Sequence, residues 1–349
     1  MPLAVAFTAP ESVEIVEEAE RPPGAEEVRV RTLYSGISAG TEMSAYRGTN
    51  PYLNKRWDLE RRLFIADPAQ SQIEYPVTGW GYEEAGEVVE AGSSVSDLPA
   101  GTLVYGSWGH RSSVVLDAAY VRERILPDGL DPLLGIFSHI GATALNGVLD
   151  ASVRLGETVA VFGLGVVGQL VAQMARLSGA RVIGVDMLPE RRQVALDLGT
   201  HLVLDASEGD SATAVKDLTD GRGADICIEA SGSYRALNEA IRTCAYTSRV
   251  VALGFYQGEG RGLFLGEEMH HNRVTIVTSQ IGGLAPELQH RWDRLRLVHT
   301  VMQLAADGDL QLASLITQVR PAVEAADLFR LVSEHPERVL QAVLDFRSL

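Results

Sequence analysis

TVAVFGLGVVGQLVAQMARLSGARVIGVD, the stretch from Thr158 to Asp186, decides the fold. It begins with a short apolar run, Val159 to Phe162, of the kind that forms a strand buried on both faces. The glycine pattern GLGVVG (163–168) follows directly, and the sequence from Gln169 to Leu177 is typical of a helix. A G-x-G-x-x-G motif between a strand and a helix predicts a dinucleotide-binding turn.

Each glycine of the motif has a separate physical task. Gly163 permits the tight turn, Gly165 lets the backbone approach a pyrophosphate, and Gly168 lets the helix pack closely on the strand. The diphosphate would then rest on the N-terminus of the helix, where backbone N–H groups are unpaired. The alternative is a glycine-rich turn that holds no ligand. The residues predicted to bind the cofactor here are Gly163, Leu164, Gly165, Val166, Val167 and Gly168.

An acidic residue, Asp186, ends the second apolar run, where a carboxylate accepts hydrogen bonds from the adenosine ribose. The same carboxylate repels a 2′-phosphate, and no arginine follows it immediately, so the sequence favours NAD over NADP. Arg191 lies either near the adenine or simply on a solvated helix face. Ser231 and Gly254, after later apolar runs, complete the predicted cofactor-binding set.

Five more apolar runs follow TVAVFG, separated by segments of helical length: RVIGVD, HLVLD, ADICIEA, RVVALG and VTIVTS. This rhythm predicts an α/β fold with a doubly wound parallel sheet of the Rossmann type. The sixth run, residues 274–279, would form a sheet edge, and exposed edges are usually covered or paired. We therefore expect a homodimer, with a tetramer as the alternative.

The flanking regions have a different character. Residues 1–128 contain short β-like runs with Gly and Pro punctuation, at Val28–Thr32, Glu87–Glu90, Leu103–Tyr105 and Ser113–Leu116. Beyond Gly283, helices are predicted at 287–306 and 323–334, and LQAVLDF (340–346) suits a strand or a helix equally. The charged and aromatic segment 48–68 is expected to be a surface loop or short helix, either covering a site or merely solvated.

The bulk composition excludes several classes of partner. The formal net charge of −16, with no basic run, argues against nucleic acid or an anionic membrane and favours a small-molecule substrate. No apolar stretch is expected to reach the roughly 18 residues of a membrane span, and the N-terminus has no basic flank, so a cytoplasmic location is expected. The two cysteines, Cys227 and Cys244, are expected to be buried thiols. They provide neither a disulfide framework nor a cysteine cluster for a structural zinc.

The chain resembles the medium-chain dehydrogenase/reductase superfamily over nearly its whole length. The resemblance lies in GISAGTE (36–42), GYEEAGEVVEAG (81–92), the stretch 155–186, the RxxxAxxLG pattern ending at Gly199, and IEASGS (228–233). Within the superfamily it is most similar to the branch of bacteriochlorophyllide 2-hydroxyethyl dehydrogenase. The resemblance implies a GroES-like β-rich catalytic domain from residues 1–128 and 284–349. It also implies a Rossmann domain at 129–283 and an active site between the two.

The departures from the family pattern concern the zinc ions. Zinc-dependent members have a Cys in the segment matching GISAGTE and a His in the segment matching GYE, and here those positions hold Ser38 or Ala39 and Tyr82. The four-cysteine zinc lobe is also absent. Glu83 is retained, and His139 lies where the third ligand is expected. We therefore expect no metal, while Glu83, His110 and His139 leave open a rearranged site with three protein ligands.

Without zinc, hydroxyl, phenol and imidazole groups must handle the proton of an alcohol substrate. Thr41 matches the proton-relay hydroxyl of the family, or is only a turn residue. Tyr82 could act as acid or base if a nearby charge lowered its pKa, or could fill the space left by the metal. Glu83 is a candidate base or orienting group, or part of a salt bridge. His110 is the preferred proton shuttle. Trp108 and His139 are predicted to line the substrate pocket, the histidines alternatively being packing residues.

Four functions remain open. The first is a zinc-independent NAD-dependent dehydrogenase acting on a secondary alcohol, such as a sugar, cyclitol or other ring-bearing compound. The second is a redox-neutral epimerase or lyase that keeps its NAD bound. The third, a quinone or enoyl reductase, normally uses NADPH, so Asp186 argues against it. The fourth is a non-catalytic NAD-binding protein.

Overall fold

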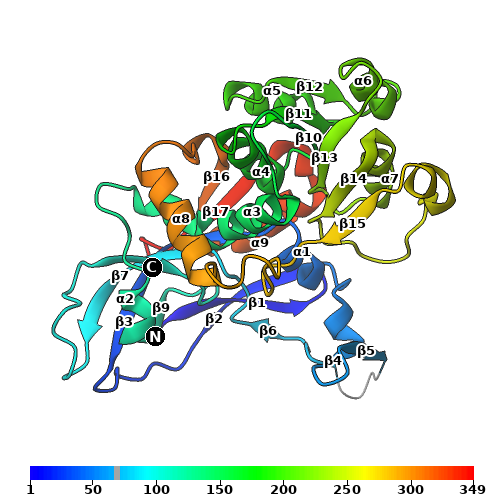
Figure 1. Cartoon of the computed structure of the whole chain (residues 1–349). Coiled ribbons are helices and arrows are strands. Elements are labelled where there is room, and N and C mark those ends of the chain that lie inside the picture. Colours follow the sequence, from blue (N-terminus) through cyan, green and yellow to red (C-terminus); the bar gives the residue numbers. More distant parts are fainter. Residues whose placement is uncertain (67–70) are drawn as a thin grey trace. The chain divides into compact units, whose positions relative to one another are not determined.

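The computed structural model describes residues 1–66 and 71–349, which form two compact units (Figure 1). The first unit joins both ends of the chain, Met1–His139 and Ile316–Leu349. The second consists of the continuous segment Ile140–Leu315. The boundaries predicted from the sequence, at 128/129 and 283/284, both come before those of the structure, which lie at 139/140 and 315/316.

The second unit is built on a six-stranded sheet in the order β12-β11-β10-β13-β14-β15, in which all neighbours are parallel. Each strand corresponds to one of the six predicted apolar runs, so the doubly wound Rossmann-type sheet is confirmed. The strand bounds are β10 (Thr158–Phe162), β11 (Arg181–Asp186), β12 (Leu202–Asp205), β13 (Ala224–Glu229), β14 (Cys244–Ala252) and β15 (Thr275–Thr278).

Helices connect these strands and bury the faces of the sheet. The side chains of β10 are buried along its whole length, as expected of a central strand covered on both faces. Cys227 and Cys244 both lie buried in the core of this unit, as predicted. The helical segments are α3 (Phe137–Ala151), α4 (Val166–Leu177), α5 (Pro189–Asp197), α6 (Ser211–Asp217), α7 (Tyr234–Thr243), η4 (Leu265–Met269), α8 (Arg294–Ala306) and η5 (Ala313–Leu315).

The segment 284–315 belongs to the second unit, although the resemblance assigned it to the catalytic domain. Its helix α8 begins at Arg294, later than the predicted start at Glu287, because Asp293 caps it by accepting from Arg296 N. Val301 of α8 packs against Gly141 of α3, and Gln311 exchanges two hydrogen bonds with Gln173 of α4. These contacts hold the segment to the unit that carries the parallel sheet.

One helical segment, Pro132–Ala151, is long and apolar enough to cross a membrane by length and composition, so the expectation that no such stretch exists was wrong. Most of it, 67%, is buried inside the protein, and it is the single candidate among the described residues. Gly147 on α3 faces the side chain of Leu253 at the end of β14. The core helix of a soluble protein passes the same test, so this candidate is weak evidence for a membrane span.

The first unit is β-rich, as predicted. A six-stranded sheet follows the order β16-β17-β3-β7-β8, with β9 pairing with β3, and a three-stranded sheet has the order β2-β1-β6. The four predicted runs lie within β3, β7, β8 and β9. The strand bounds are β1 (Leu3–Ala9), β2 (Ser12–Glu17), β3 (Glu27–Ile37), β6 (Val77–Thr78), β7 (Glu84–Ala91), β8 (Leu103–Gly106), β9 (Ser113–Asp117), β16 (Ile316–Pro321) and β17 (Gln341–Asp345).

The C-terminal segment LQAVLDF, which suited a strand or a helix, forms β17. This strand pairs antiparallel with β3 from the N-terminal part of the chain and parallel with β16. Because of this pairing, the two ends of the chain share one sheet. The helical segments of the unit are α1 (Thr41–Tyr46), η1 (Pro51–Leu53), α2 (Ala118–Arg122), η3 (Pro132–Ile136), η6 (Ala322–Glu324), α9 (Ala325–Glu334) and η7 (Pro336–Arg338).

The described part of the segment 48–68 combines a short helix, η1 (Pro51–Leu53), with a β-hairpin that was not predicted. After η1, strands β4 (Lys55–Asp58) and β5 (Leu63–Ala66) pair antiparallel as a separate two-stranded sheet. Trp57 and Phe64 are direct cross-strand partners, and their rings pack edge-on at 5.0 Å. Aromatic cross-strand pairs of this kind stabilise a hairpin. Residues 67 and 68 lie outside the described residues.

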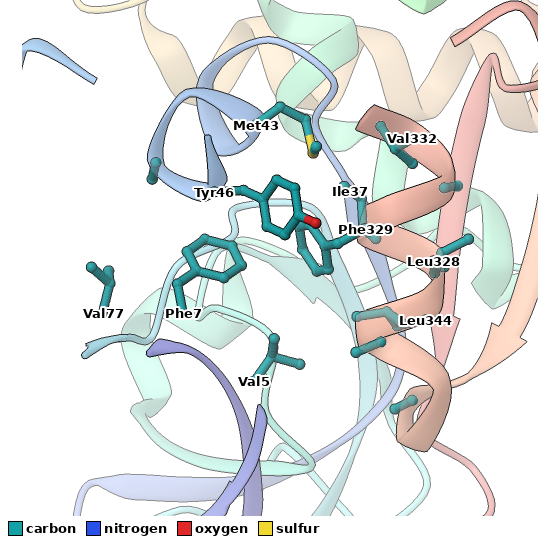
Figure 2. Packing of buried hydrophobic residues seen from close by; sticks show 14 of the residues in the cluster. Val5, Phe7, Ile37, Met43, Tyr46, Val77, Leu328, Phe329, Val332 and Leu344 are labelled. Carbon is teal, nitrogen blue, oxygen red and sulfur yellow. The ribbon is translucent and has the colours of Figure 1, made fainter. Parts of the chain in front are cut away.

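A cluster of aromatic side chains forms the core between β1, α1 and α9. Figure 2 shows Phe7, Tyr46 and Phe329 packed together, with Met43 and Leu328 beside them. The ring of Phe329 lies edge-on to Phe7 at 5.1 Å and stacked on Tyr46 at 5.7 Å. Phe329 is fully buried, so these contacts attach the C-terminal helix α9 to the N-terminal strands.

We predict that Phe329→Ala lowers the free energy of unfolding by about 3–5 kcal/mol, because it removes a fully buried ring and leaves a cavity. Phe329→Leu, which fills more of the space, should cost less. Urea unfolding followed by fluorescence measures both variants. The control is Val323→Ala, which truncates a 59% exposed side chain just before α9. A cost for Phe329→Ala no larger than that of the control would contradict this description of the core.

Candidate functional site

The glycine turn between β10 and α4 has the close packing that the sequence predicted. Gly163 adopts a φ of +86°, and a Cβ on it would lie 2.6 Å from the Cβ of Ser231. At Gly168, a Cβ would lie 1.8 Å from the carbonyl oxygen of Gly163, which no side chain tolerates. Helix α4 therefore begins in direct contact with the turn, and its first N–H groups point out of the end of β10.

Gly165, the N-cap of α4, differs from the other two glycines. A Cβ placed on it would have as its nearest neighbour outside the turn the Nη1 atom of Arg191, at 3.7 Å. Its lack of a side chain is therefore not required by packing within the protein. This glycine leaves the start of the helix accessible to a ligand, which supports the ligand-binding interpretation of the motif over a purely structural turn.

Asp186 at the end of β11 is almost buried, and both its carboxylate oxygens accept backbone hydrogen bonds. Leu164 N donates to Oδ2 at 2.7 Å, and Leu188 N donates to Oδ1 at 2.9 Å. The carboxylate thus ties the glycine turn to the loop that follows β11. It lies at the carboxyl end of β11, against the glycine turn that precedes α4.

Two arginines at the start of α5 lie beside the turn. Arg191 is partly buried and reaches Gly165, so the structure does not support its alternative reading as a merely solvated helix charge. Arg192 was not singled out from the sequence. It donates to the carbonyl oxygens of Asp186 and Met187, both at 2.9 Å, and forms an ion pair with Asp205 at 2.6 Å. Its guanidinium is therefore committed to holding the loop after β11.

Ser231 and Gly254 lie at the ends of β13 and β14, next to the same turn. Both the backbone N and the Oγ of Ser231 donate to Glu229 Oε1. Gly254 N donates to the carbonyl oxygen of Glu229 at 3.0 Å, and a Cβ on Gly254 would lie 2.1 Å from Gly232 N. The predicted cofactor-binding residues of the second unit therefore gather at the carboxyl ends of adjacent strands.

In the first unit, a group of hydroxyls surrounds Tyr82. The phenol of Tyr82 donates to Ser38 Oγ and is also hydrogen-bonded to the side chain of Thr41. Its ring lies 4.5 Å from that of His139. Burial raises the pKa of the Tyr82 phenol far above its usual value, and the carboxylates of Glu83 and Glu42 raise it further. The condition under which Tyr82 could act as acid or base, a nearby charge that lowers its pKa, is not met, because Glu83 and Glu42 raise that pKa.

His110 is fully buried and bridges two other buried residues. Its Nε2 lies 2.8 Å from Glu42 Oε2, and its Nδ1 lies 2.7 Å from Ser35 Oγ. Burial lowers the pKa of His110 to about 4, although Glu84 opposes this effect. The imidazole is therefore neutral at neutral pH and enclosed, so it does not contact a substrate as the preferred shuttle was expected to do.

Glu83 and Glu84 are also fully buried. Glu84 accepts hydrogen bonds from Ser35 Oγ at 3.0 Å and Trp108 N at 2.6 Å, while Glu83 Oε2 accepts from Gln341 Nε2 at 3.1 Å. Burial raises the pKa of both carboxyls, Glu42 raises both further, and Glu84 also raises that of Glu83. Within the described residues, Glu83 has no basic partner, so the salt bridge considered for it is not formed.

Trp108 was expected to line a substrate pocket, but it is a core residue. Its side chain is 8% exposed and packs with Val28, Val30 and Val88. The indole Nε1 donates to Thr32 Oγ1 at 2.9 Å. With its polar atom satisfied and its ring surrounded by aliphatic side chains, Trp108 is not available to a ligand.

Sequence reasoning missed Glu42, Ser35 and Glu84 in the first unit and Glu229 and Tyr256 in the second. One signal was present for Glu42, which is an acidic residue within the otherwise uncharged segment TEMSAY. A buried acid in such a segment needs hydrogen-bond donors from elsewhere in the chain. The partners themselves, such as His110, are distant in sequence and leave no local pattern.

The chain is similar to known dehydrogenases along its whole length. A family model described as zinc-binding dehydrogenase matches residues 166–297. D-guloside 3-dehydrogenase from Shigella flexneri is 31% identical over 344 residues, covering 97% of this chain and 98% of that protein. The chain belongs to the medium-chain dehydrogenase/reductase superfamily. The narrower likeness to the bacteriochlorophyllide branch stays a prediction.

Solved structures of medium-chain dehydrogenases share the fold. A zinc-binding dehydrogenase from Sinorhizobium meliloti bound to NADP has a TM-score of 0.77 and 22% identity, over 99% of both chains. An alcohol dehydrogenase of Escherichia coli CFT073 complexed with NADH has a TM-score of 0.75 and 18% identity, also over 99% of both chains. The relatives are oxidoreductases, which supports that general class of activity for this member of the superfamily.

The side chains at the positions that match the family's zinc ligands have hydrogen-bond partners within the protein. Tyr82 replaces a ligand and donates its phenolic hydrogen to Ser38. The proposed rearranged set of Glu83, His110 and His139 is not brought together, because His110 is held by Glu42 and Ser35. Across residues 1–66 and 71–349, no three His, Cys, Asp or Glu side chains are grouped as a metal ion requires.

We predict that stability depends on pH through His110. Its pKa is about 4 in the folded protein and 6.5 in an unfolded chain, so only the unfolded state gains a proton between these values. Its contribution is present above pH 6.5 and lost as the pH falls toward 4, by up to about 3 kcal/mol. Urea unfolding at several pH values should show a shallower decline for His110→Gln than for the wild type.

The control for this measurement is His335→Gln, which alters an exposed histidine of the same unit and should retain the wild-type dependence on pH. Equal slopes for the wild type and His110→Gln between pH 6.5 and 4 would show that His110 is not held neutral in the folded protein.

Proposed function

We propose that the protein is an NAD-dependent dehydrogenase that oxidises a secondary hydroxyl of a ring-bearing substrate, such as a glycoside, without zinc. The observation that carries this proposal is the turn at Gly165, where the start of α4 is left open while the neighbouring glycines are needed for packing. The bound cofactor would supply the hydride acceptor. All remaining chemistry falls to side chains of this protein.

The residues of the second unit fit a dinucleotide. The turn 163–168 and the N-terminus of α4 would hold the diphosphate, with Arg191 adding a positive charge beside it. Asp186 would accept from the adenosine ribose, and a 2′-phosphate would meet its negative charge. Ser231 and Gly254 would border the other half of the dinucleotide. This arrangement favours NAD over NADP, although relatives of similar fold include an NADP-bound and an NADH-bound protein.

Proton transfer would pass through Tyr82 in the first unit. Its raised pKa keeps the phenol neutral, so it cannot act as a phenolate base. A neutral phenol can still accept the substrate's hydroxyl proton if it passes its own hydrogen to Ser38 Oγ and Ser38 releases its hydroxyl hydrogen to water at the same time. Thr41 and His139 lie beside it and would orient the substrate oxygen. Glu83, Glu42 and His110 would support this group from the interior.

One similar protein supports the proposed substrate class. It is named D-guloside 3-dehydrogenase, and its similarity extends over both units of this protein. A sugar ring has no charge, which agrees with the acidic character of the chain, and its hydroxyls suit the Ser38, Thr41 and Tyr82 hydroxyls as hydrogen-bond partners. We therefore propose a neutral glycoside rather than a phosphorylated sugar.

Strand β15 ends the sheet order, and in the described residues it pairs with β14 on one side alone. An edge of this kind is usually covered or paired, so we propose a homodimer or homotetramer, which sedimentation velocity distinguishes from a monomer. We also propose a cytoplasmic location for the protein, which cell fractionation tests.

We predict that calorimetry finds NAD binding at least about tenfold tighter than NADP binding, since Asp186 favours a free 2′-hydroxyl. Asp186→Asn should weaken NAD binding by about tenfold and narrow the difference between the two cofactors. Glu190→Gln, which makes the same change at an exposed position nearby, is the control and should bind as the wild type does. If the folded wild-type protein bound neither dinucleotide, the proposed function would lose its basis.

We predict that the purified protein reduces NAD in the presence of glycosides and that Tyr82→Phe lowers kcat by about tenfold to a hundredfold. NAD affinity should not change, because Tyr82 lies in the other unit. Tyr246→Phe alters a 64% exposed phenol and serves as the control. Activity should survive dialysis against a chelator. One zinc per chain with loss of activity on chelation would refute the zinc-free mechanism, and tightly bound NAD without net reduction would favour a redox-neutral reaction.

A further inference from the structure

The carboxylate of Glu229 joins the loops that follow β13 and β14. Its Oε1 accepts from Ser231 N at 2.7 Å and from Ser231 Oγ, and its Oε2 accepts from Gly232 N at 3.1 Å and from the phenol of Tyr256. Four donors from two loops thus converge on one buried side chain, which is 0% exposed. None of these donors is a basic group.

The backbone around Glu229 is equally constrained. Its carbonyl oxygen accepts from Leu253 N at 2.9 Å and Gly254 N at 3.0 Å. A Cβ on Gly232 would lie 2.8 Å from Phe255 O. The loops after β13 and β14 are therefore in direct backbone contact, and neither can shift without the other.

These loops also touch the glycine turn. A Cβ on Gly163 would lie 2.6 Å from the Cβ of Ser231, so the loop after β13 lies against the turn after β10. Among the described residues, the carboxylate of Glu229 accepts no hydrogen bond from that turn. It fixes Ser231, which forms the side of the turn away from Asp186.

The order of the sheet places Glu229 on one side of β10 and Asp186 on the other. In sheets of this kind a ligand binds at the carboxyl ends of the strands, at the point where the connections change direction, here between β10 and β13. A dinucleotide with its diphosphate on α4 and its adenosine ribose at Asp186 must extend its nicotinamide half over the loops after β13 and β14. The inference that the nicotinamide half extends over these loops rests on the proposed function.

We propose that Glu229 is a positioning residue that shapes the nicotinamide half of the cofactor site, by holding the two loops in one fixed arrangement. It does not touch the adenosine half. A buried carboxylate without a cation is stable only while its donors stay in place, so the loops and the carboxylate hold each other. Tyr256 contributes one of the four donors, and its ring packs on Tyr234 at 5.2 Å.

The variant Glu229→Gln tests the nicotinamide half of the site separately from the adenosine half. The amide replaces one acceptor oxygen by an NH2 group, which faces donors instead of accepting from them. We expect the Kd for NADH to rise about tenfold, while the Kd for ADP, which carries the adenosine and diphosphate alone, changes by less than about twofold. The nicotinamide fluorescence of bound NADH should also change, because it reports on the surroundings of that ring.

Two further variants complete the experiment. Glu259→Gln makes the same chemical change at an exposed position of the loop after β14, and it should bind NADH and ADP as the wild type does. Tyr256→Phe removes one donor and leaves the carboxylate, so it should raise the Kd for NADH by about threefold, with no effect on ADP. Circular dichroism confirms that each variant is folded. If Glu229→Gln does not fold, Tyr256→Phe decides.

The outcomes separate this proposal from the proposed function. Wild-type protein that binds neither NADH nor ADP would refute the proposed function. Wild-type protein that binds both, with Glu229→Gln or its substitute Tyr256→Phe unchanged toward NADH, would overturn the positioning role. Parallel losses for NADH and ADP would also overturn it, because they would indicate a general structural effect on the unit.

Discussion

The contact between Gly168 and the carbonyl oxygen of Gly163 constrains everything at the carboxyl edge of the parallel sheet. A Cβ on Gly168 would lie only 1.8 Å from that oxygen, so helix α4 starts as close to β10 as the backbone permits. The N-terminus of the helix is thereby placed at the end of the central strand, between β11 and β13. Leu164 N, freed from regular pairing by the turn, finds its acceptor in Asp186, so the turn also determines where that carboxylate lies.

Three buried carboxylates accept several hydrogen bonds from backbone N–H groups. Asp186 accepts from two amides, Glu229 from two amides and two hydroxyls, and Glu84 from two amides and one hydroxyl. In each case the donating N–H groups have no partner in a regular helix or strand. Burying a carboxylate is costly, and several donors offset that cost only if the geometry is complete. Such residues therefore fix loops more rigidly than exposed ion pairs do.

The sequence predicted what depends on local pattern. All six parallel strands, the helix α4 and the glycine turn follow from runs of apolar residues and from glycine spacing, which act over a few neighbouring positions. The hairpin of β4 and β5 was missed because its pairing rests on Trp57 and Phe64 meeting across strands in a segment with many charges. Trp108 was expected to line a substrate pocket and His110 to shuttle protons, yet both are enclosed by residues far away in sequence. Burial by distant residues produces no pattern in the residues that adjoin Trp108 and His110 in the sequence.

Tyr82 stands at a position that matches a zinc ligand of the family, and its surroundings keep the proton on its phenol. A metal ion lowers the pKa of an alcohol bound to it, whereas the surroundings of Tyr82 raise the pKa of its phenol. Two of the nearest charged groups are Glu83 and Glu42, whose own pKa values are raised by burial. A group surrounded in this way holds its proton tightly, so in the proposed reaction it would exchange one hydrogen for another along the hydroxyls beside it. Glu42 of α1 is bonded to His110, which would keep α1, and with it Thr41, in place beside the phenol.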